Sequence, residues 1–242
     1  MADTAERKEE VWALESHLTE LRWRLFACLL GFLLSLLISI YLVPFLLLRL
    51  QALAPTGSTF FQIKPGELFF VYFKLAVFIS ILLSGPFCIY QLAAFVWPGL
   101  KLHEKRIASV FFVGGPCLFV AGVLFAYFVA IKPMLAFLLG FGVNLKLVEP
   151  HYSLDFYVSL VTTALLISGL AFQLPVLLFV AACLGLLTSA QLVRFWKEAI
   201  FAAFVLAAII TPTPDPINMS ILGLALAALY GGSLFAIKLI GR

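Results

Sequence analysis

A short polar stretch, 94–106, separates two long apolar segments and holds the side chains best suited to chemistry. The carboxylate of Glu104 lies next to the histidine His103, and the aromatic side chains of Phe95 and Trp97 come shortly before them. Three cations complete the stretch: Lys101, Lys105 and Arg106. In a chain this apolar, a loop so rich in charged and aromatic groups indicates recognition of a ligand rather than mere connection.

The composition of the whole chain indicates that the elements around this loop lie in a membrane. Of its 242 residues, 64% are hydrophobic and only 12% are charged, and the mean hydropathy is +1.12. A soluble domain is typically about 45–50% apolar and about 25% charged, so a soluble protein is excluded. The 25 phenylalanines suit helices that face lipid. The predicted fold class is therefore an all-α integral membrane protein.

Six apolar segments are predicted to cross the bilayer as helices. They are 25–43, 68–93, 107–131, 156–187, 199–210 and 217–237. The first ends at Pro44 and, at about 1.5 Å per residue, just crosses a hydrocarbon core of roughly 30 Å. The fourth is longer than needed, so a tilt or a kink at Pro175 is expected. The fifth gives only about 18 Å of helix, so the bilayer is expected to thin around it.

Two long connections, 44–67 and 132–155, are punctuated by proline and glycine. In the first, short helices broken by prolines are predicted rather than sheet. Lys74 falls in the first turns of the second span, where its long side chain is expected to reach the membrane surface.

The chain is predicted to form a single transmembrane domain, 1–242. Residues 1–24 make a charged leader whose leucines follow helical spacing, which predicts an amphipathic helix at the membrane surface. Residues 25–237 make the six-helix bundle. The acidic residues of the leader and the late start of the first apolar segment argue against a cleavable targeting peptide.

The distribution of Lys and Arg predicts the orientation in the membrane. With six spans, both termini, the stretch 94–106 and the stretch 188–198 fall on one side, which carries eleven of the 16 cations against five on the other. Short cytoplasmic segments carry an excess of Lys and Arg. Both termini and the stretch 94–106 are therefore predicted to be cytoplasmic.

Short blocks along the chain carry a family resemblance. They are HLTELRWRL at 17–25, SGP at 84–86, EKR at 104–106, FAYF at 125–128, AFQLP at 171–175 and TPTPD at 211–215. In this order they resemble the TatC family, the large multispanning subunit of the twin-arginine protein translocase. The resemblance covers nearly the whole chain, and six spans with two cytoplasmic termini agree with it.

The resemblance implies a function. It implies a translocase core subunit that binds the twin-arginine signal peptides of folded precursor proteins at the cytoplasmic face and nucleates the translocation complex. It assigns the reading of the arginines to the carboxylates of Glu20 and Glu104. It places three further residues on the same surface: Arg22, Phe95 and Arg106. Carboxylates suit this task, because each accepts two parallel N–H bonds from a guanidinium.

Both carboxylates have a simpler interpretation. Glu20 lies one helical turn before Arg24, which is the spacing of a local ion pair. Glu104 precedes Lys105 and Arg106, which is typical of a solvated cluster at a membrane surface. These interpretations remain open at this stage.

Polar residues in the later spans form a second group of candidates. Gln173 either satisfies carbonyls freed by Pro175 or makes a polar contact on the concave face of the bundle. Many bacterial family members carry Glu at this position. The resemblance also implies that the last hairpin contacts partner subunits through a polar patch, here supplied by Thr211, Asp215 and Asn218. Asp215 is alternatively a cap for the last helix.

The expected partners follow from the resemblance. They are single-span translocase subunits of the TatA and TatB type, twin-arginine signal peptides, the lipid bilayer and further copies of the chain, without nucleic acid. The expected location is a bacterial plasma (inner) membrane or a thylakoid-type membrane, with the proton-motive force as the energy source. No cofactor, metal or enzymatic activity is expected, because the three histidines and four cysteines lack ligand spacing and no ATP-binding loop is present.

Two other classes compete with this interpretation. A proton- or solute-coupled secondary transporter needs paired ionisable groups at mid-membrane, and the spans hold essentially none once Lys74 is assigned to the interface. A membrane-embedded enzyme needs a nucleophile–base pair or metal ligands at depth, but the three histidines lie outside the spans.

Overall fold

The computed structural model describes the backbone of residues 2–55, 58–97, 102–144, 151–183, 185–211 and 216–239. Within these ranges, the side chains of 2–14, 16, 102–104, 106–112, 140–144, 210 and 239 lie outside the described part. The described chain is mostly helical, as the composition predicts.

The first helix, α1 (Ala2–Gln51), is a single helix of 50 residues that contains both the leader and the first span. It continues through Pro44, so the prediction that the helix ends there is wrong. The proline removes one backbone hydrogen bond, but Val43 and Leu50 are fully buried, and the Tyr157 hydroxyl donates to the carbonyl oxygen of Leu50. Packing on the bundle therefore stabilises the last turns.

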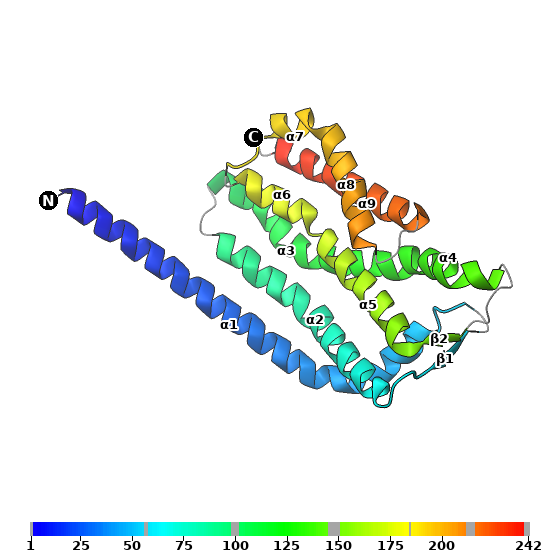
Figure 1. Cartoon of the computed structure of the whole chain (residues 1–242). Helices are drawn as coiled ribbons and strands as arrows, with labels where there is room; N and C mark the ends of the chain where they lie inside the picture. The colour runs from blue at the N-terminus through cyan, green and yellow to red at the C-terminus, as the bar shows by residue number, and fades with distance from the viewer. Residues whose placement is uncertain are drawn as a thin grey trace.

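The second span matches its prediction, and the third does not. Helix α2 (Glu67–Val96) packs along α1 (Figure 1). The third apolar stretch forms α3 (Leu102–Phe125), a π-helical turn (Ala126–Ala130) and α4 (Ile131–Asn144). The predicted connection at 132–155 is therefore helical as far as Asn144. Pro133 falls in the first turn of α4, directly after the π-helical turn, where a missing N–H costs little.

The last third of the chain contains shorter helices. The fourth span divides into α5 (Leu154–Ala171) and α6 (Leu174–Cys183), and this break just before Pro175 confirms the predicted kink. Then follow α7 (Ser189–Arg194), α8 (Trp196–Ile210) and α9 (Pro216–Leu239). Helices α8 and α9 pack on each other, and α9 also packs on α6 (Figure 1).

Two short strands join the long connections, which corrects the prediction that no sheet forms there. Strand β1 (Thr59–Phe61) pairs in parallel with β2 (His151–Ser153), with Thr59 opposite His151. Phe60 packs against the buried ring of Tyr157 at 4.9 Å between centroids. Burial raises the pKa of the Tyr152 phenol, which donates to the carbonyl oxygen of Leu139 at 2.7 Å. These contacts fasten both connections to the bundle.

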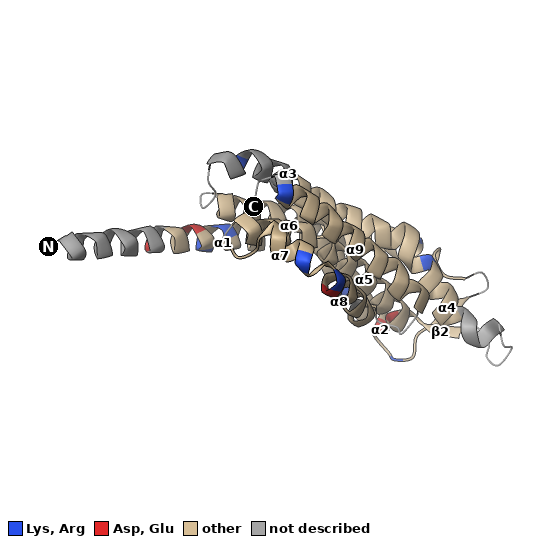
Figure 2. Cartoon of the chain, turned by 90° about the horizontal axis from the view of Figure 1, so that it is seen from above, with Lys and Arg blue, Asp and Glu red and all other residues tan. Residues whose placement is uncertain are grey.

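Figures 1 and 2 show the two ends of the molecule. The start of α1, the end of α2, the start of α3 and the end of α9 lie toward one end, which we call the N-side. Strands β1 and β2 lie at the opposite end, which we call the strand side.

Five helical stretches of the described chain are long and apolar enough to cross a membrane. They are His17–Gln51, Glu67–Val96, Val113–Leu139, Leu154–Cys183 and Pro216–Lys238. In the most apolar part of the first, only 11% of the residues are buried inside the protein, so much of this apolar surface is left for contacts outside the chain. Helix α8 has 15 residues and does not reach the length of a span on its own.

Candidate functional site

The candidate recognition site lies on the N-side, where α1 and α2 meet. Helical spacing places His17, Glu20 and Arg24 on one face of α1, because they are separated by three and four residues. Gln91 and Phe95, four residues apart, share a face of α2. These five residues form what we call the N-side cluster.

Ring stacking brings the leader against the end of α2. The rings of His17 and Phe95 lie 4.2 Å apart between centroids, and their planes differ by 19°. This contact places the leader beside the stretch that begins at residue 94. It also holds the start of α1 next to Phe95, one of the residues that the resemblance assigns to the recognition surface.

A hydrogen-bonded chain of three side chains lies one turn further along. Arg24 donates from Nε and Nη2 to the same carboxylate oxygen, Oε1 of Glu20, at 3.0 and 2.6 Å. Its third nitrogen, Nη1, donates to the side-chain oxygen of Gln91 at 3.0 Å. The local pair between Glu20 and Arg24 is therefore present, and it extends to the neighbouring helix.

The remaining recognition candidates are placed only in part. Arg22 is exposed and lines an open hollow of about 500 Å³ on α1, together with Trp23 and Phe26. Glu104 and Arg106 lie in the first turns of α3, on the N-side, but their side chains are outside the described residues.

Gln173 occupies the break between α5 and α6 and is only 9% exposed. Its Nε2 donates to the carbonyl oxygen of Gly115 on α3 at 3.1 Å. The amide therefore contacts a neighbouring helix, and the expected contact with a carbonyl freed by Pro175 is not the bond it makes. The bond joins the break in the fourth span to the residue before Pro116 in the third.

The candidates of the last hairpin have different environments. The Thr211 hydroxyl donates to the Ala207 carbonyl of its own helix at 2.9 Å. Asn218 is 3% exposed, and its Oδ1 accepts no hydrogen bond from any described residue. Asp215 lies outside the described residues.

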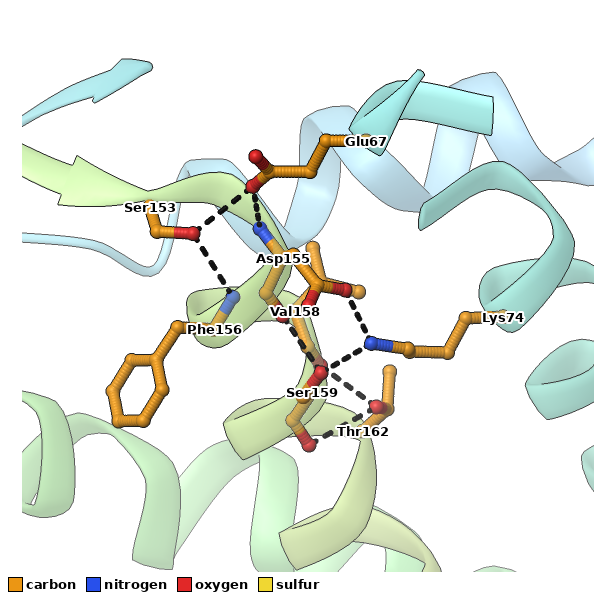
Figure 3. Close-up of polar contacts among 8 residues, drawn as sticks. All are labelled: Glu67, Lys74, Ser153, Asp155, Phe156, Val158, Ser159 and Thr162. Carbon is orange, nitrogen blue, oxygen red and sulfur yellow. Dashed lines mark hydrogen bonds and ion pairs between the residues drawn. The ribbon is translucent and has the colours of Figure 1, made fainter. Parts of the chain in front are cut away.

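The sequence interpretation missed a polar network on the strand side (Figure 3). Glu67 is 7% exposed, and its carboxylate accepts bonds from the backbone N–H groups of Ile63 and Lys64 at 2.7 and 3.1 Å. It also accepts from the Ser153 hydroxyl at 3.0 Å and from the Asp155 N–H at 3.2 Å. The Asp155 N–H belongs to the first turn of α5, so Glu67 caps α5 from another helix.

Lys74 belongs to the same network, and the sequence did not predict its partners. Its ammonium group pairs with the carboxylate of Asp155 and also donates to the Ser159 hydroxyl (Figure 3). A sequence signal existed. Lys74 and Asp155 each lie near the strand-side end of a predicted span, so they fall at a similar depth.

The fold and the site together define a class of protein. The chain is a multi-pass helical protein in which a leader helix and the end of the second helix form a charged and aromatic cluster. The sequence pattern of the Sec-independent protein translocase protein (TatC) family matches residues 16–224. The chain belongs to the TatC family.

Several relatives support this assignment. A Sec-independent protein translocase protein TatC from Synechocystis sp. is 38% identical over 231 residues, which cover 95% of this chain and 89% of the relative. The TatC of Aquifex aeolicus is 34% identical, with 95% and 96% covered. The chloroplastic TATC of Arabidopsis thaliana is 33% identical, with 98% and 71% covered.

A solved structure agrees with the fold. The crystal structure of the twin arginine translocase receptor TatC in DDM superposes with a TM-score of 0.79 at 33% identity, covering 92% of this chain and 99% of the other. The chain is therefore a Sec-independent protein translocase subunit, a multi-pass component of protein transport.

Proposed function

We propose that this chain binds the twin-arginine signal peptides of folded precursors at its N-side and nucleates the translocation complex. The observation that supports this most directly is the N-side cluster, where contacts across 67 and 78 residues of sequence join the leader to α2 next to the recognition stretch. Glu20 and Glu104 are the proposed readers of the two guanidinium groups. Arg22, Phe95 and Arg106 complete the surface.

The chemistry of Glu20 suits this role. A carboxylate near the surface accepts two parallel N–H bonds from a guanidinium, whereas an ammonium group lacks that fork. The Glu20 side chain is 35% exposed, so a peptide can reach it from water. Phe95 and the apolar surface around Trp23 and Phe26 then offer contacts for the apolar part of a signal peptide.

The test is photocrosslinking of a twin-arginine signal peptide and a Lys-Lys version to membranes that contain the chain. Crosslinks are expected with the first peptide only, and Glu20→Gln or Glu104→Gln should weaken them. Glu15→Gln is the matched control, because Glu15 is exposed on the same helix and its side chain is outside the cluster. Undiminished crosslinks in both the Glu20 and Glu104 variants would falsify the carboxylate-reading role.

We further propose six spans, with both termini in the cytoplasm. The five long stretches and α8 supply the spans, and the start of α1 and the end of α9 lie toward the same end in Figure 1. Helix α8 measures about 22 Å at 1.5 Å per residue, less than a core of roughly 30 Å, so the bilayer thins locally around it. Protease protection of tags at both termini in sealed vesicles tests this topology.

Partner subunits are proposed to bind the later spans. Asn218 supports this, because a buried acceptor without a donor is costly unless a rearrangement or a partner satisfies it. Gln173, Thr211 and Asp215 are the other proposed contacts for single-span subunits of the TatA and TatB type. Crosslinking from cysteines placed along α9 tests this, and contacts confined to α1 would contradict it.

The secondary-transporter alternative gains no support. The ion pair between Lys74 and Asp155 lies near the ends of its two helices, and both side chains are more than a third exposed. A coupling site needs its ionisable pair near mid-membrane.

A further inference from the structure

We propose that Arg24 is a built-in competitor for the arginine-reading carboxylate of Glu20, and that Gln91 holds Arg24 when an incoming guanidinium displaces it. The inference rests on the proposed function, because it assumes that Glu20 reads a signal-peptide arginine. It assigns Arg24 and Gln91 a part in setting the affinity of the site.

Only one of the two carboxylate oxygens of Glu20 accepts a hydrogen bond from a described residue. Both contacts from Arg24 to Glu20 end on Oε1, at 3.0 and 2.6 Å. No described residue donates to Oε2 of Glu20. The pair therefore lacks the two-oxygen geometry of the strongest guanidinium–carboxylate contacts. An incoming arginine that takes both oxygens must displace Arg24 from Oε1.

The resting contact is weak enough to exchange. Arg24 and Glu20 are four residues apart on one helix, and their side chains are 25% and 35% exposed. Partly exposed helix pairs of this kind change an equilibrium by only about twofold, because solvent screens the charges.

Gln91 can keep Arg24 hydrogen-bonded after Arg24 has left Glu20. The bond from Nη1 of Arg24 to the Gln91 oxygen, at 3.0 Å, does not involve Glu20, so it can persist after the exchange. The N–H groups that leave Oε1 can turn to water, because Arg24 is partly exposed. The exchange therefore leaves no buried donor unpaired, which keeps its cost low.

A competitor inside the molecule changes affinity more than selectivity. It opposes a guanidinium and an ammonium alike when either displaces it, so the preference for arginine still comes from the two-oxygen geometry. The competitor also favours release, because Arg24 remains beside Glu20 while the peptide is bound. Its removal should therefore tighten binding, mainly through slower dissociation.

The experiment measures the dissociation constant of a fluorescent twin-arginine signal peptide and its Lys-Lys version with the full chain in nanodiscs. Arg24→Gln should tighten binding of the twin-arginine peptide about twofold and leave the ratio between the peptides unchanged. Arg24→Lys keeps the charge but loses the fork that reaches both Glu20 and Gln91, so it should tighten binding by a smaller factor.

Gln91→Leu, measured in two backgrounds, is the second test. It removes a bond that Arg24 makes both before and after the exchange, so it should change binding in the wild-type background by no more than about twofold. In the Arg24→Gln background the same change should have no effect. A purely structural role of Gln91 would weaken binding equally in both backgrounds, which would overturn the proposal.

The remaining outcomes separate the two hypotheses. If Glu20→Gln leaves binding unchanged, the proposed function fails for Glu20 and the competitor role fails with it. If Glu20→Gln weakens binding but Arg24→Gln also weakens it, Arg24 positions Glu20 and only the competitor role is wrong. If Arg24→Lys matches the wild type while Arg24→Gln tightens binding, the local charge alone explains the effect and the competitor role is again wrong.

Discussion

The two ends of the molecule each place a glutamate between helices, but they use it differently. On the strand side, Glu67 is 7% exposed and accepts bonds from four groups in the first connection and at the start of α5. On the N-side, the Glu20 side chain is 35% exposed and has Arg24 as its partner, on one of its two oxygens. Both carboxylate oxygens of Glu67 accept hydrogen bonds within the fold. Among the described residues only Oε1 of Glu20 accepts one, so Oε2 is available to a ligand.

Their hydrogen bonds distinguish Glu67, a structural group, from Glu20, the proposed recognition group. A buried carboxylate with all its neighbours donating to it cannot change partner without leaving several N–H groups unsatisfied. A half-exposed carboxylate with one local partner can exchange that partner at low cost. The strand-side network therefore fixes the connections to the bundle, and the N-side cluster keeps the freedom that the proposed peptide binding requires.

The largest effect is expected from breaking the strand-side network with Glu67→Leu. The change leaves the N–H groups of Ile63, Lys64 and Asp155 without their acceptor and removes the cap of α5. The melting temperature in detergent should fall by about 5–10 °C. Fluorescence-detected size exclusion after heating measures this.

Glu67→Gln is the control for this experiment. The amide keeps one acceptor oxygen, so part of the network survives and the loss should be smaller. A melting temperature of Glu67→Leu that equals the wild type would show that the first connection does not depend on Glu67.

The next largest effect is expected on the N-side, where Glu20→Gln should weaken peptide binding without lowering the melting temperature appreciably. Removing the charge should weaken binding of a twin-arginine peptide by about tenfold, because a charged acceptor is lost. The melting temperature should change by no more than about 1 °C, since the local pair with Arg24 is exposed. Fluorescence anisotropy and thermal unfolding of the same sample measure both quantities.

A large fall in the melting temperature of Glu20→Gln would remove the contrast between the two ends. Glu20 would then be structural in the same sense as Glu67. Glu15→Gln serves as the control for the loss of one negative charge on α1.

A smaller effect is expected from the aromatic stack. His17→Ala removes the ring that packs on Phe95, so the start of α1 should lose its alignment with α2. Peptide binding should weaken by about threefold, within the range of aromatic pairs, without a change in melting temperature. His17→Phe keeps the stack and should restore binding; equal losses in both variants would show that the imidazole itself is required.

The sequence predicted the elements whose signal is local. Helix α2 follows a long, mostly apolar run, so its predicted bounds agree with the structure to within a few residues. The pair between Glu20 and Arg24 follows from their spacing on one helix. The short length of α8 follows from its charged and proline-rich flanks.

The sequence did not predict what depends on distant contacts. Pro44 is visible as a missing N–H, but the hydroxyl that stabilises the turns beyond it belongs to Tyr157, 107 residues away from its acceptor on Leu50. The bond between Arg24 and Gln91 joins residues that are 67 positions apart, and no local sequence pattern predicts it. The parallel pairing of β1 and β2 likewise requires that the two connections meet at one end of the bundle.

The smallest effect is expected from Lys74→Met, which removes the cation of the strand-side ion pair. Lys74 and Asp155 are 37% and 42% exposed, so solvent screens their attraction, and the pair should contribute about 0.5 kcal/mol or less. The expected fall in melting temperature is about 1–2 °C, well below that of Glu67→Leu, because Glu67 and not Lys74 satisfies the backbone of the first connection. The exchanged pair, Lys74→Asp with Asp155→Lys, should recover part of the loss. If Lys74→Met destabilised the chain as strongly as Glu67→Leu, the ion pair would share the structural role, and the stability of the strand side would depend on charge as much as on hydrogen bonds to the backbone.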